Sequence, residues 1–163
     1  MLRKQLLITI VLLLTSACIT QKIGSKQAAN PQVLSQLESE KMSKADIYKT
    51  LGQPHDIAYN NQNSAWIYYF ITERPGWSTF IPIVGMATGG GKRNTKVTEI
   101  YFNPNNVFIQ AKATEKEEYV NIWSSLTNSK KNYTPYQRVE REMSALGLPY
   151  NKKAIDRVKY FTN

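Results

Sequence analysis

A short apolar run near the N-terminus, followed soon by the only cysteine of the chain, constrains the fold more than any other feature. Residues 6–14 are apolar except for Thr9, and the positively charged Arg3 and Lys4 precede them. Nine residues are too few to cross a bilayer as a helix, but they match the apolar core of a secretory signal. Cleavage after Ala17 would remove 17 of the 163 residues and leave 146, enough for one compact domain.

The cysteine itself, Cys18, directly follows Thr-Ser-Ala, and this stretch resembles a bacterial lipobox. The resemblance implies that diacylglycerol alkylates the thiol, that the chain is cut before Cys18, and that the new amine is acylated. Thr15 stands where Leu is usual, with Leu14 one place earlier. With one cysteine no intramolecular disulfide is possible, and the alternative is ordinary secretion with a free thiol. We therefore expect residues 1–17 to be a lipoprotein signal peptide and Cys18 to be the lipidation site.

The net positive charge of the chain indicates which classes of binding partner to expect. Its 21 Lys and Arg outnumber 12 Asp and Glu, giving a formal net charge of +9, and the basic residues are spread along the chain. An exported lipoprotein rarely meets nucleic acid, so the expected anions are lipid phosphates, cell-wall acids and acidic proteins. Solvated surface lysines are the simpler explanation for any single cluster.

The part of the chain after the signal divides into three segments. Residues 18–29 lack periodicity, so we expect the lipidated cysteine to be followed by a tether that lets the domain stand clear of the membrane. Residues 30–114 contain helix and strand patterns and are expected to form the main domain. Residues 115–163 are expected to be a helical C-terminal extension, because apolar residues recur at helical spacing from Tyr119 onward.

Two helices with marked ends are predicted before the strands. Asn30 followed by Pro31 predicts the start of the first helix, with Asn as the cap and Pro in the first turn. Ser43 and Asp46 have the spacing of an acidic capping box at the start of the second. Gly52 then suits the left-handed position at its end.

Residues rich in aromatic and β-branched side chains follow the helices. Strands are predicted at 56–59, 65–72 and 96–102, and a tight turn at 103–106 leads to a last strand from residue 107. We expect an α+β fold, with two N-terminal helices packed on a three-stranded antiparallel meander and additional C-terminal helices.

The alternation of side chains also predicts the core. Trp66 and Tyr68 point to one face of the central strand, and Ile47 and Leu51 lie on one face of the second helix. These four side chains are expected to pack together.

Residues 42–114 resemble the BamE-like (SmpA/OmlA) small outer-membrane lipoproteins. The resemblance rests on the helix 42–54 that ends in Leu-Gly-Gln-Pro, on Trp-Ile-Tyr at 66–68, and on Ile-Tyr-Phe-Asn at 100–103 with the turn that follows. Lys41 stands where that family usually has Gly, and the connection after the first long strand is longer than in its compact members. The resemblance identifies residues 30–114 as a BamE-like α+β domain.

The resemblance implies a protein that acts by contact and without catalysis or a cofactor. Its expected partner is an envelope protein, in outer-membrane β-barrel assembly or in envelope integrity. Ile19, rather than Asp, follows the lipidated cysteine, which favours a lipid-anchored position on the outer membrane, facing the periplasm. A surface-tethered inhibitor or ligand-binding module is the alternative, because architecture does not determine function.

The connection between the two long strands holds the candidate interface. Its residues 75–88 are unusually apolar for a loop, and they either fold back on the domain or meet a partner or membrane. The basic pair beside them would favour anionic lipid head groups. The candidate contact residues are Phe80, Ile81, Ile83, Val84, Lys92 and Arg93.

Two further features were weighed as catalytic or ligand-binding signals. His55, the only histidine, has no cysteine or second histidine to complete a catalytic or metal site, so a structural role is expected. The run Gly89–Gly91 before Lys92 departs from a phosphate-binding loop, because Gly91 stands where that motif needs Lys. We expect no metal site.

Overall fold

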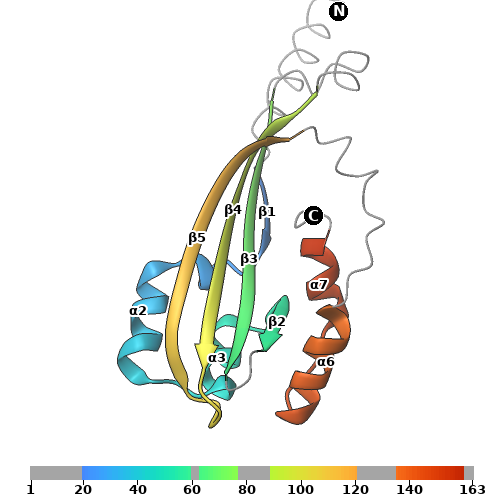
Figure 1. Cartoon of the computed structure of the whole chain (residues 1–163). Helices are drawn as coiled ribbons and strands as arrows, with labels where there is room; N and C mark the ends of the chain where they lie inside the picture. Colours follow the sequence, from blue (N-terminus) through green and yellow to red (C-terminus); the bar gives the residue numbers. More distant parts are fainter. Residues whose placement is uncertain (1–19, 60–62, 77–88, 121–134, 160–163) are drawn as a thin grey trace, which may run out of the picture.

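The computed structural model describes residues 20–59, 63–76, 89–120 and 135–159 (Figure 1). In chain order the elements are β1 (Gln21–Gly24), the 3-10 helix η2 (Gln27–Ala29), α2 (Pro31–Glu40), α3 (Lys44–Leu51), β2 (Asp56–Tyr59), β3 (Ser64–Pro75), β4 (Gly91–Phe102), β5 (Phe108–Val120), α6 (Pro135–Ala145) and α7 (Lys152–Lys159). None of the helices in these ranges is long and apolar enough to cross a membrane.

The strands form one antiparallel sheet in the order β1-β3-β4-β5, and β2 also pairs with β3. β1 lies opposite residues 70–73 of β3, whereas β2 lies opposite residues 64–67. The two short strands therefore lie end to end along one edge of β3. β3, β4 and β5 are long and curved, and their upper part extends beyond the helices as an arm (Figure 1).

The expected arrangement of two N-terminal helices on a three-stranded meander is wrong. The chain is α+β and has helices after the sheet, as expected, but strand β1 comes before the helices and the sheet of the described residues has five strands. β1 and β2 have four residues each, and they are held by backbone pairing with β3. Such short strands carry too little side-chain alternation for their place in a sheet to be read from sequence.

The segment 18–29, expected to be a tether, is part of the domain from residue 21 onward. Its residues 21–24 form β1, and Ala28 in η2 is 1% exposed, with its carbonyl accepting a 2.7 Å hydrogen bond from the buried Thr98 hydroxyl. The domain therefore begins within three residues of Cys18.

The predicted helix starts are confirmed, because capping is a local interaction. The Asn30 side chain accepts a 3.0 Å hydrogen bond from the Gln32 amide at the start of α2. Ser43 caps α3 through the Asp46 amide, and Asp46 is hydrogen-bonded to the Ser43 hydroxyl at 2.6 Å. Gly52 ends α3 with a φ of +79°.

The predicted core is confirmed as well. Trp66, Tyr68, Ile47 and Leu51 belong to one cluster of buried side chains, and α3 covers the face of the sheet from which Trp66 and Tyr68 point. Val139, Met143 and Ile155, from the two C-terminal helices, join the same cluster. α6 and α7 thus complete this core.

The long strands differ from their expected limits at the arm. β3 continues to Pro75 and β4 starts at Gly91, so both strands extend into the connection expected between 65–72 and 96–102. β5 runs to Val120, and the helix expected around Tyr119 is wrong there, because Tyr119 pairs with Lys92 on β4. Cross-strand pairing, which comes from distant residues, overrides the local helical spacing.

Candidate binding surfaces

The two faces of the sheet differ along the arm. Residues directly opposite one another on neighbouring strands, and every second residue along a strand, lie on the same face. On the helix-covered face, Tyr68, Thr98, Trp66 and Ile100 form the buried rows. Farther up the arm the rows on this face are half-buried or exposed, and apart from Phe70 their residues are polar or charged.

These upper rows line a cavity of about 540 Å³, which we call the basic groove. Neutral residues of the lining are Thr20, Phe70, Thr72 and Asn94. Its charged residues are Lys22, Lys26, Arg74, Lys92, Lys96 and Glu117. Five basic side chains against one acidic side chain make the groove a site for anions.

Carboxylates on β5 neutralise part of this charge. Lys92 pairs with Glu117 at 2.9 Å, and Lys96 pairs with Glu115 at 3.2 Å. Hydrogen bonds from Asn94 and Lys96 lower the pKa of Glu115. Lys22, Lys26 and Arg74, by contrast, have no salt bridge with any described residue. Their charges are available to a ligand.

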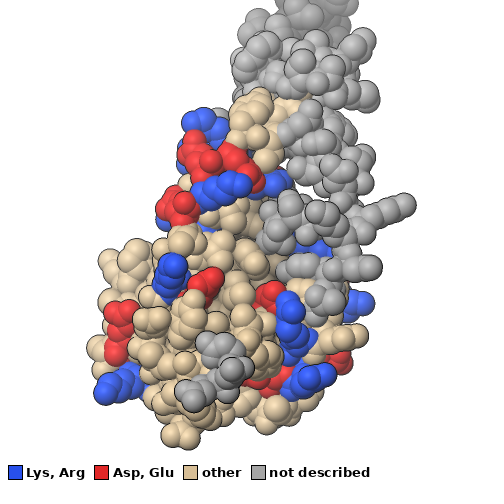
Figure 2. Space-filling view, in the orientation of Figure 1, with Lys and Arg blue, Asp and Glu red and all other residues tan. Residues whose placement is uncertain are grey.

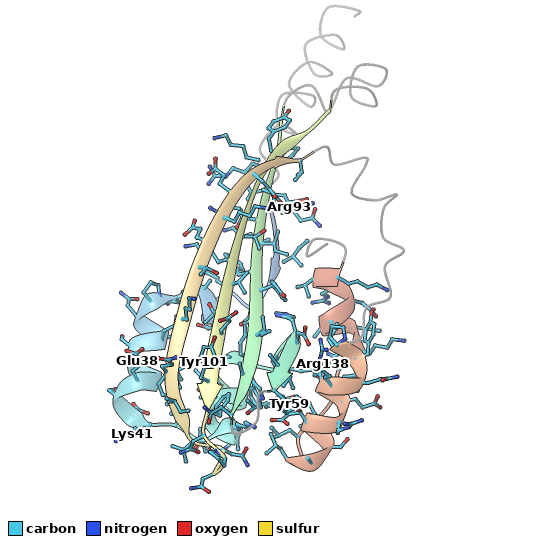
Figure 3. The ribbon with its side chains drawn as sticks, viewed as in Figure 1. Glu38, Lys41, Tyr59, Arg93, Tyr101 and Arg138 are labelled. Carbon is cyan, nitrogen blue, oxygen red and sulfur yellow. The ribbon has the colours of Figure 1, made fainter. Side chains whose placement is uncertain are left out.

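The structure separates the two basic residues of the candidate interface. Lys92 points into the basic groove, and its side chain is 70% exposed. Arg93 points to the opposite face, where it is 4% exposed and its Nε donates a 2.7 Å hydrogen bond to Glu73. Figure 3 shows Arg93 at the upper end of the sheet. Adjacent strand residues alternate between faces, so this pair does not act as one patch.

Five of the predicted site residues lie outside the described residues. They are Cys18, Phe80, Ile81, Ile83 and Val84. The lipidation site and the apolar part of the candidate interface therefore stay predictions.

The opposite face of the lower sheet, which we call the open face, carries Ile67, Tyr69, Val97 and Tyr101. All four are half-buried. Figure 2 shows a mostly uncharged surface here, below the charged upper end of the molecule. A small hollow of about 120 Å³ opens beside Ile67 and Tyr101.

His55 has the structural role expected for it. The side chain is 4% exposed, and its Nδ1 accepts a 3.0 Å hydrogen bond from the backbone amide of Tyr69. Burial lowers its pKa to about 4, so the ring is neutral and helps to hold the start of β2 against β3. Among the described residues no group of three or more His, Cys, Asp or Glu side chains could hold a metal ion.

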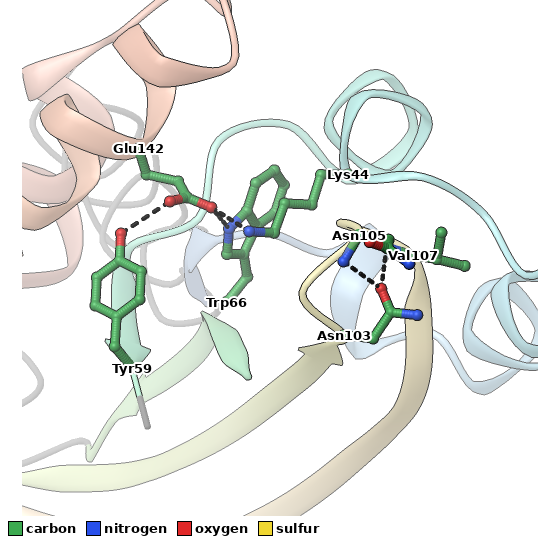
Figure 4. Close-up of polar contacts among 7 residues, drawn as sticks. All are labelled: Lys44, Tyr59, Trp66, Asn103, Asn105, Val107 and Glu142. Atoms are coloured by element: carbon green, nitrogen blue, oxygen red, sulfur yellow. Dashed lines mark hydrogen bonds and ion pairs between the residues drawn. The ribbon is translucent and has the colours of Figure 1, made fainter. Parts of the chain in front are cut away.

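A buried polar cluster, absent from the sequence predictions, ties α6 to the rest of the domain (Figure 4). Glu142 accepts hydrogen bonds from Lys44 at 2.5 Å, from the Trp66 indole at 3.1 Å and from the Tyr59 hydroxyl at 2.8 Å. Burial alone would raise the pKa of Glu142, but these hydrogen bonds outweigh it and lower the pKa. Burial, followed by the bond to Glu142, raises the pKa of Tyr59.

A second ion pair supports the same helix. The Arg138 guanidinium of α6 holds both carboxylate oxygens of Asp56 on β2, at 2.8 and 2.9 Å. Together with the Glu142 cluster, it fixes α6 beside β2. The polar residues of α6 therefore stabilise the fold, whereas the basic groove and the open face remain accessible.

Comparisons with protein-family models, with curated proteins and with solved structures find no match to this chain.

Proposed function

We propose that this chain is a lipid-anchored, non-enzymatic protein of the bacterial outer membrane that binds an envelope protein through the open face. The resemblance to BamE-like lipoproteins suggests a partner in β-barrel assembly or envelope integrity. The anchor in this proposal is Cys18, and the domain faces the periplasm.

The observation that carries the proposal is the composition of the open face. Ile67, Val97 and two tyrosines lie on one face of the sheet, and all four side chains are partly exposed. Aliphatic and aromatic side chains grouped on an accessible surface are typical of protein interfaces. Tyr101 is held in place by its hydroxyl, which donates a 2.5 Å hydrogen bond to Glu99 and leaves the ring rigid.

The hollow beside Tyr101 supports a protein partner in particular. Ala58, Ala65 and Ile67 give the hollow an apolar lining, and Ser64 and Glu99 add polar groups to it. An apolar hollow with a polar rim fits an inserted side chain, the usual anchor at the centre of a protein interface.

Site-specific photocrosslinking in cells tests the proposal. A photoreactive phenylalanine at Tyr101 should crosslink an envelope protein, whereas the same residue at Tyr119, which is 69% exposed on the arm, should not. Val97→Glu should abolish the Tyr101 crosslink, because it puts a charge into the interface. Equal crosslinking from Tyr101 and Tyr119, or a crosslink that Val97→Glu leaves intact, would refute the open face as the contact surface.

A further inference from the structure

The basic groove has cations at an upper and a lower level, and in the row between them the two central strands carry the neutral residues Thr72 and Asn94. Arg74 and Lys92 lie opposite each other at the upper level, and Lys96 lies four residues farther along β4. Four residues of strand span about 13 Å. Lys26, at the start of η2, joins the lower level as a lining residue. Two anionic groups at a comparable separation would each meet one cation without a salt bridge to a described residue, Arg74 or Lys26, and one lysine that is already paired with a carboxylate of β5.

Between these levels the two central strands present neutral side chains that form hydrogen bonds. Thr72 lies opposite Asn94 in the middle row, with Lys22 on the β1 side and Glu117 on the β5 side. The Thr72 hydroxyl, the Asn94 amide and the Glu117 carboxylate can donate hydrogen bonds to, or accept them from, the hydroxyl groups of a sugar. Phe70, in the next row, offers an apolar ring to the carbon face of a sugar.

We propose that the basic groove binds a glycan that carries two phosphate groups, one at each end of a disaccharide-sized unit. The upper phosphate meets Arg74 and Lys92, and the lower phosphate meets Lys26 and Lys96. The sugar lies across Thr72 and Asn94. A simple polyanion would need neither Thr72 and Asn94 nor Phe70.

The position of the groove relative to the lipid anchor suggests where the glycan comes from. Thr20 lines the groove, and only Ile19 separates it from Cys18, a reach of about 7 Å. If Cys18 is acylated, the groove lies at the level of lipid head groups. The glycan of a membrane glycolipid is then within reach. The location rests on the anchor of the proposed function, whereas the ligand chemistry rests on the groove alone.

Calorimetric titration of the full chain, purified from membranes with its N-terminal modification, tests the ligand chemistry. The probe is glucosamine disaccharide 1,4′-bisphosphate, and one saturable site is expected. Arg74→Gln and Lys26→Gln should each weaken binding about tenfold, the usual effect of losing one charge-assisted hydrogen bond. Neither residue has a salt bridge with a described residue, so neither change leaves a carboxylate of that kind unpaired.

The matched control is Lys41→Gln, at the end of the molecule away from the arm (Figure 3). It should bind the bisphosphate as the unchanged chain does. The monophosphates add a second control. For the monophosphate that lacks the upper phosphate, Arg74→Gln should leave the affinity unchanged. For the monophosphate that lacks the lower phosphate, Lys26→Gln should leave the affinity unchanged. Thermal melts verify that every variant is folded.

Several outcomes would overturn the proposal. Pyrophosphate that binds as tightly as the bisphosphorylated disaccharide would reduce the groove to a general anion site. Absence of binding, or an equal loss in Lys41→Gln, would remove the site altogether. None of these outcomes depends on the open face, whose crosslinks test the proposed protein partner separately.

The source of the glycan is identified by measuring how fast individual lysines of the protein are chemically acetylated when it is anchored in nanodiscs. A bisphosphorylated glycolipid in the same bilayer should slow acetylation of Lys22 and Lys92 several-fold, and that of Lys41 not at all. Protection by the free saccharide alone would assign the ligand to a soluble glycan and overturn the membrane source. The intact mass of the protein reports acylation independently, so failure of the anchor is distinguishable from failure of the groove.

Discussion

At the scale of single residues, Glu142 connects side chains that lie far apart in the sequence. Its carboxylate joins Lys44 of α3, Tyr59 of β2 and Trp66 of β3 to helix α6. Lys44 is 4% exposed, and its ammonium lies 5.2 Å from the ring centre of Phe102. Without the carboxylate this cation would be buried among aromatic rings.

We predict that Glu142→Leu destabilises the protein by about 3–5 kcal/mol, the usual effect of removing one partner from a buried ion pair. Glu140→Leu, an exposed position on the same helix, should change the free energy of unfolding by less than about 0.5 kcal/mol. Urea unfolding followed by circular dichroism measures both. A loss below about 1 kcal/mol for Glu142→Leu would show that Lys44 finds other partners.

His55 predicts a pH dependence of stability. Its pKa is about 4 in the folded protein and near 6.5 when unfolded, so the unfolded chain binds the proton more strongly. Its stabilising effect is complete above pH 6.5 and is lost as the pH falls toward 4. A difference of about 2.5 pKa units corresponds to about 3 kcal/mol.

Urea unfolding at a series of pH values between 7 and 4 checks this prediction. His55→Asn keeps an acceptor for the Tyr69 amide but does not titrate, so its stability should fall less over that range than that of the unchanged chain. Glu142 and Glu115, whose pKa values are lowered, lose their contribution only below the ordinary range of a glutamate, near 4.5. Parallel pH profiles for both chains would contradict the burial of His55.

At the scale of elements, strand β1 depends on a glycine. Gly24 has a φ of +91°, and a Cβ added there would lie 2.0 Å from the Tyr69 carbonyl oxygen of β3. Only a residue without a side chain allows the strand to leave the sheet at this point and turn toward η2. The place of strand β1 in the sheet thus depends on Gly24.

We predict that Gly24→Ala detaches or displaces β1. The clash should add about 1–3 kcal/mol to the backbone cost of about 1–2 kcal/mol. Gly147→Ala is the matched control, because Gly147 also has a positive φ, +65°, but open space around its Cβ position. Hydrogen exchange of the β1 amides, with thermal melts, should show faster exchange in Gly24→Ala alone. Equal effects of the two changes would mean that β1 shifts freely.

The elements also show what the sequence could predict. Helix starts at Asn30 and Ser43 were predictable, because a cap and its amide lie within three residues. β1 and the upper part of β5 were not, since their partners on β3 and β4 lie far away in sequence. Tyr119 opens a run with the spacing of a helix, but it lies in strand β5, where it pairs with Lys92 of β4.

The candidate sites show the same difference between local features, which the sequence predicts, and long-range contacts, which it does not. Lys92 was predictable as a basic residue beside an apolar stretch, but its separation from Arg93 depends on strand alternation, which required β4 to begin at Gly91. The basic groove joins residues from 20 to 117, and Lys44 pairs with Glu142 over 98 positions. No sequence spacing indicates contacts of that kind, because they arise only when distant strands and helices pack.

At the scale of the whole molecule, the arm and the anchor belong to the same end. β1 lies beside the upper half of β3, so Thr20 and the basic groove are close to the point where the chain continues toward Cys18. The open face and the buried Glu142 cluster lie on the part of the sheet nearer the helices. If Cys18 is acylated as proposed, the basic groove lies near the membrane, and the open face lies farther along the sheet, where the proposed partner would bind.

This geometry depends on Cys18, and we predict that Cys18→Ser abolishes acylation and membrane retention. The chain has no other cysteine, so no second thiol can accept the diacylglycerol. Three acyl chains hold a protein firmly, because each buried methylene contributes about 0.8 kcal/mol. Metabolic labelling with a clickable palmitate, followed by membrane fractionation, measures both effects. The conservative control is Ser16→Ala, which keeps a small residue before the cysteine and should keep the label. Equal labelling of the unchanged chain and Cys18→Ser would show that the anchor lies elsewhere, and the basic groove would then have no fixed place at the membrane.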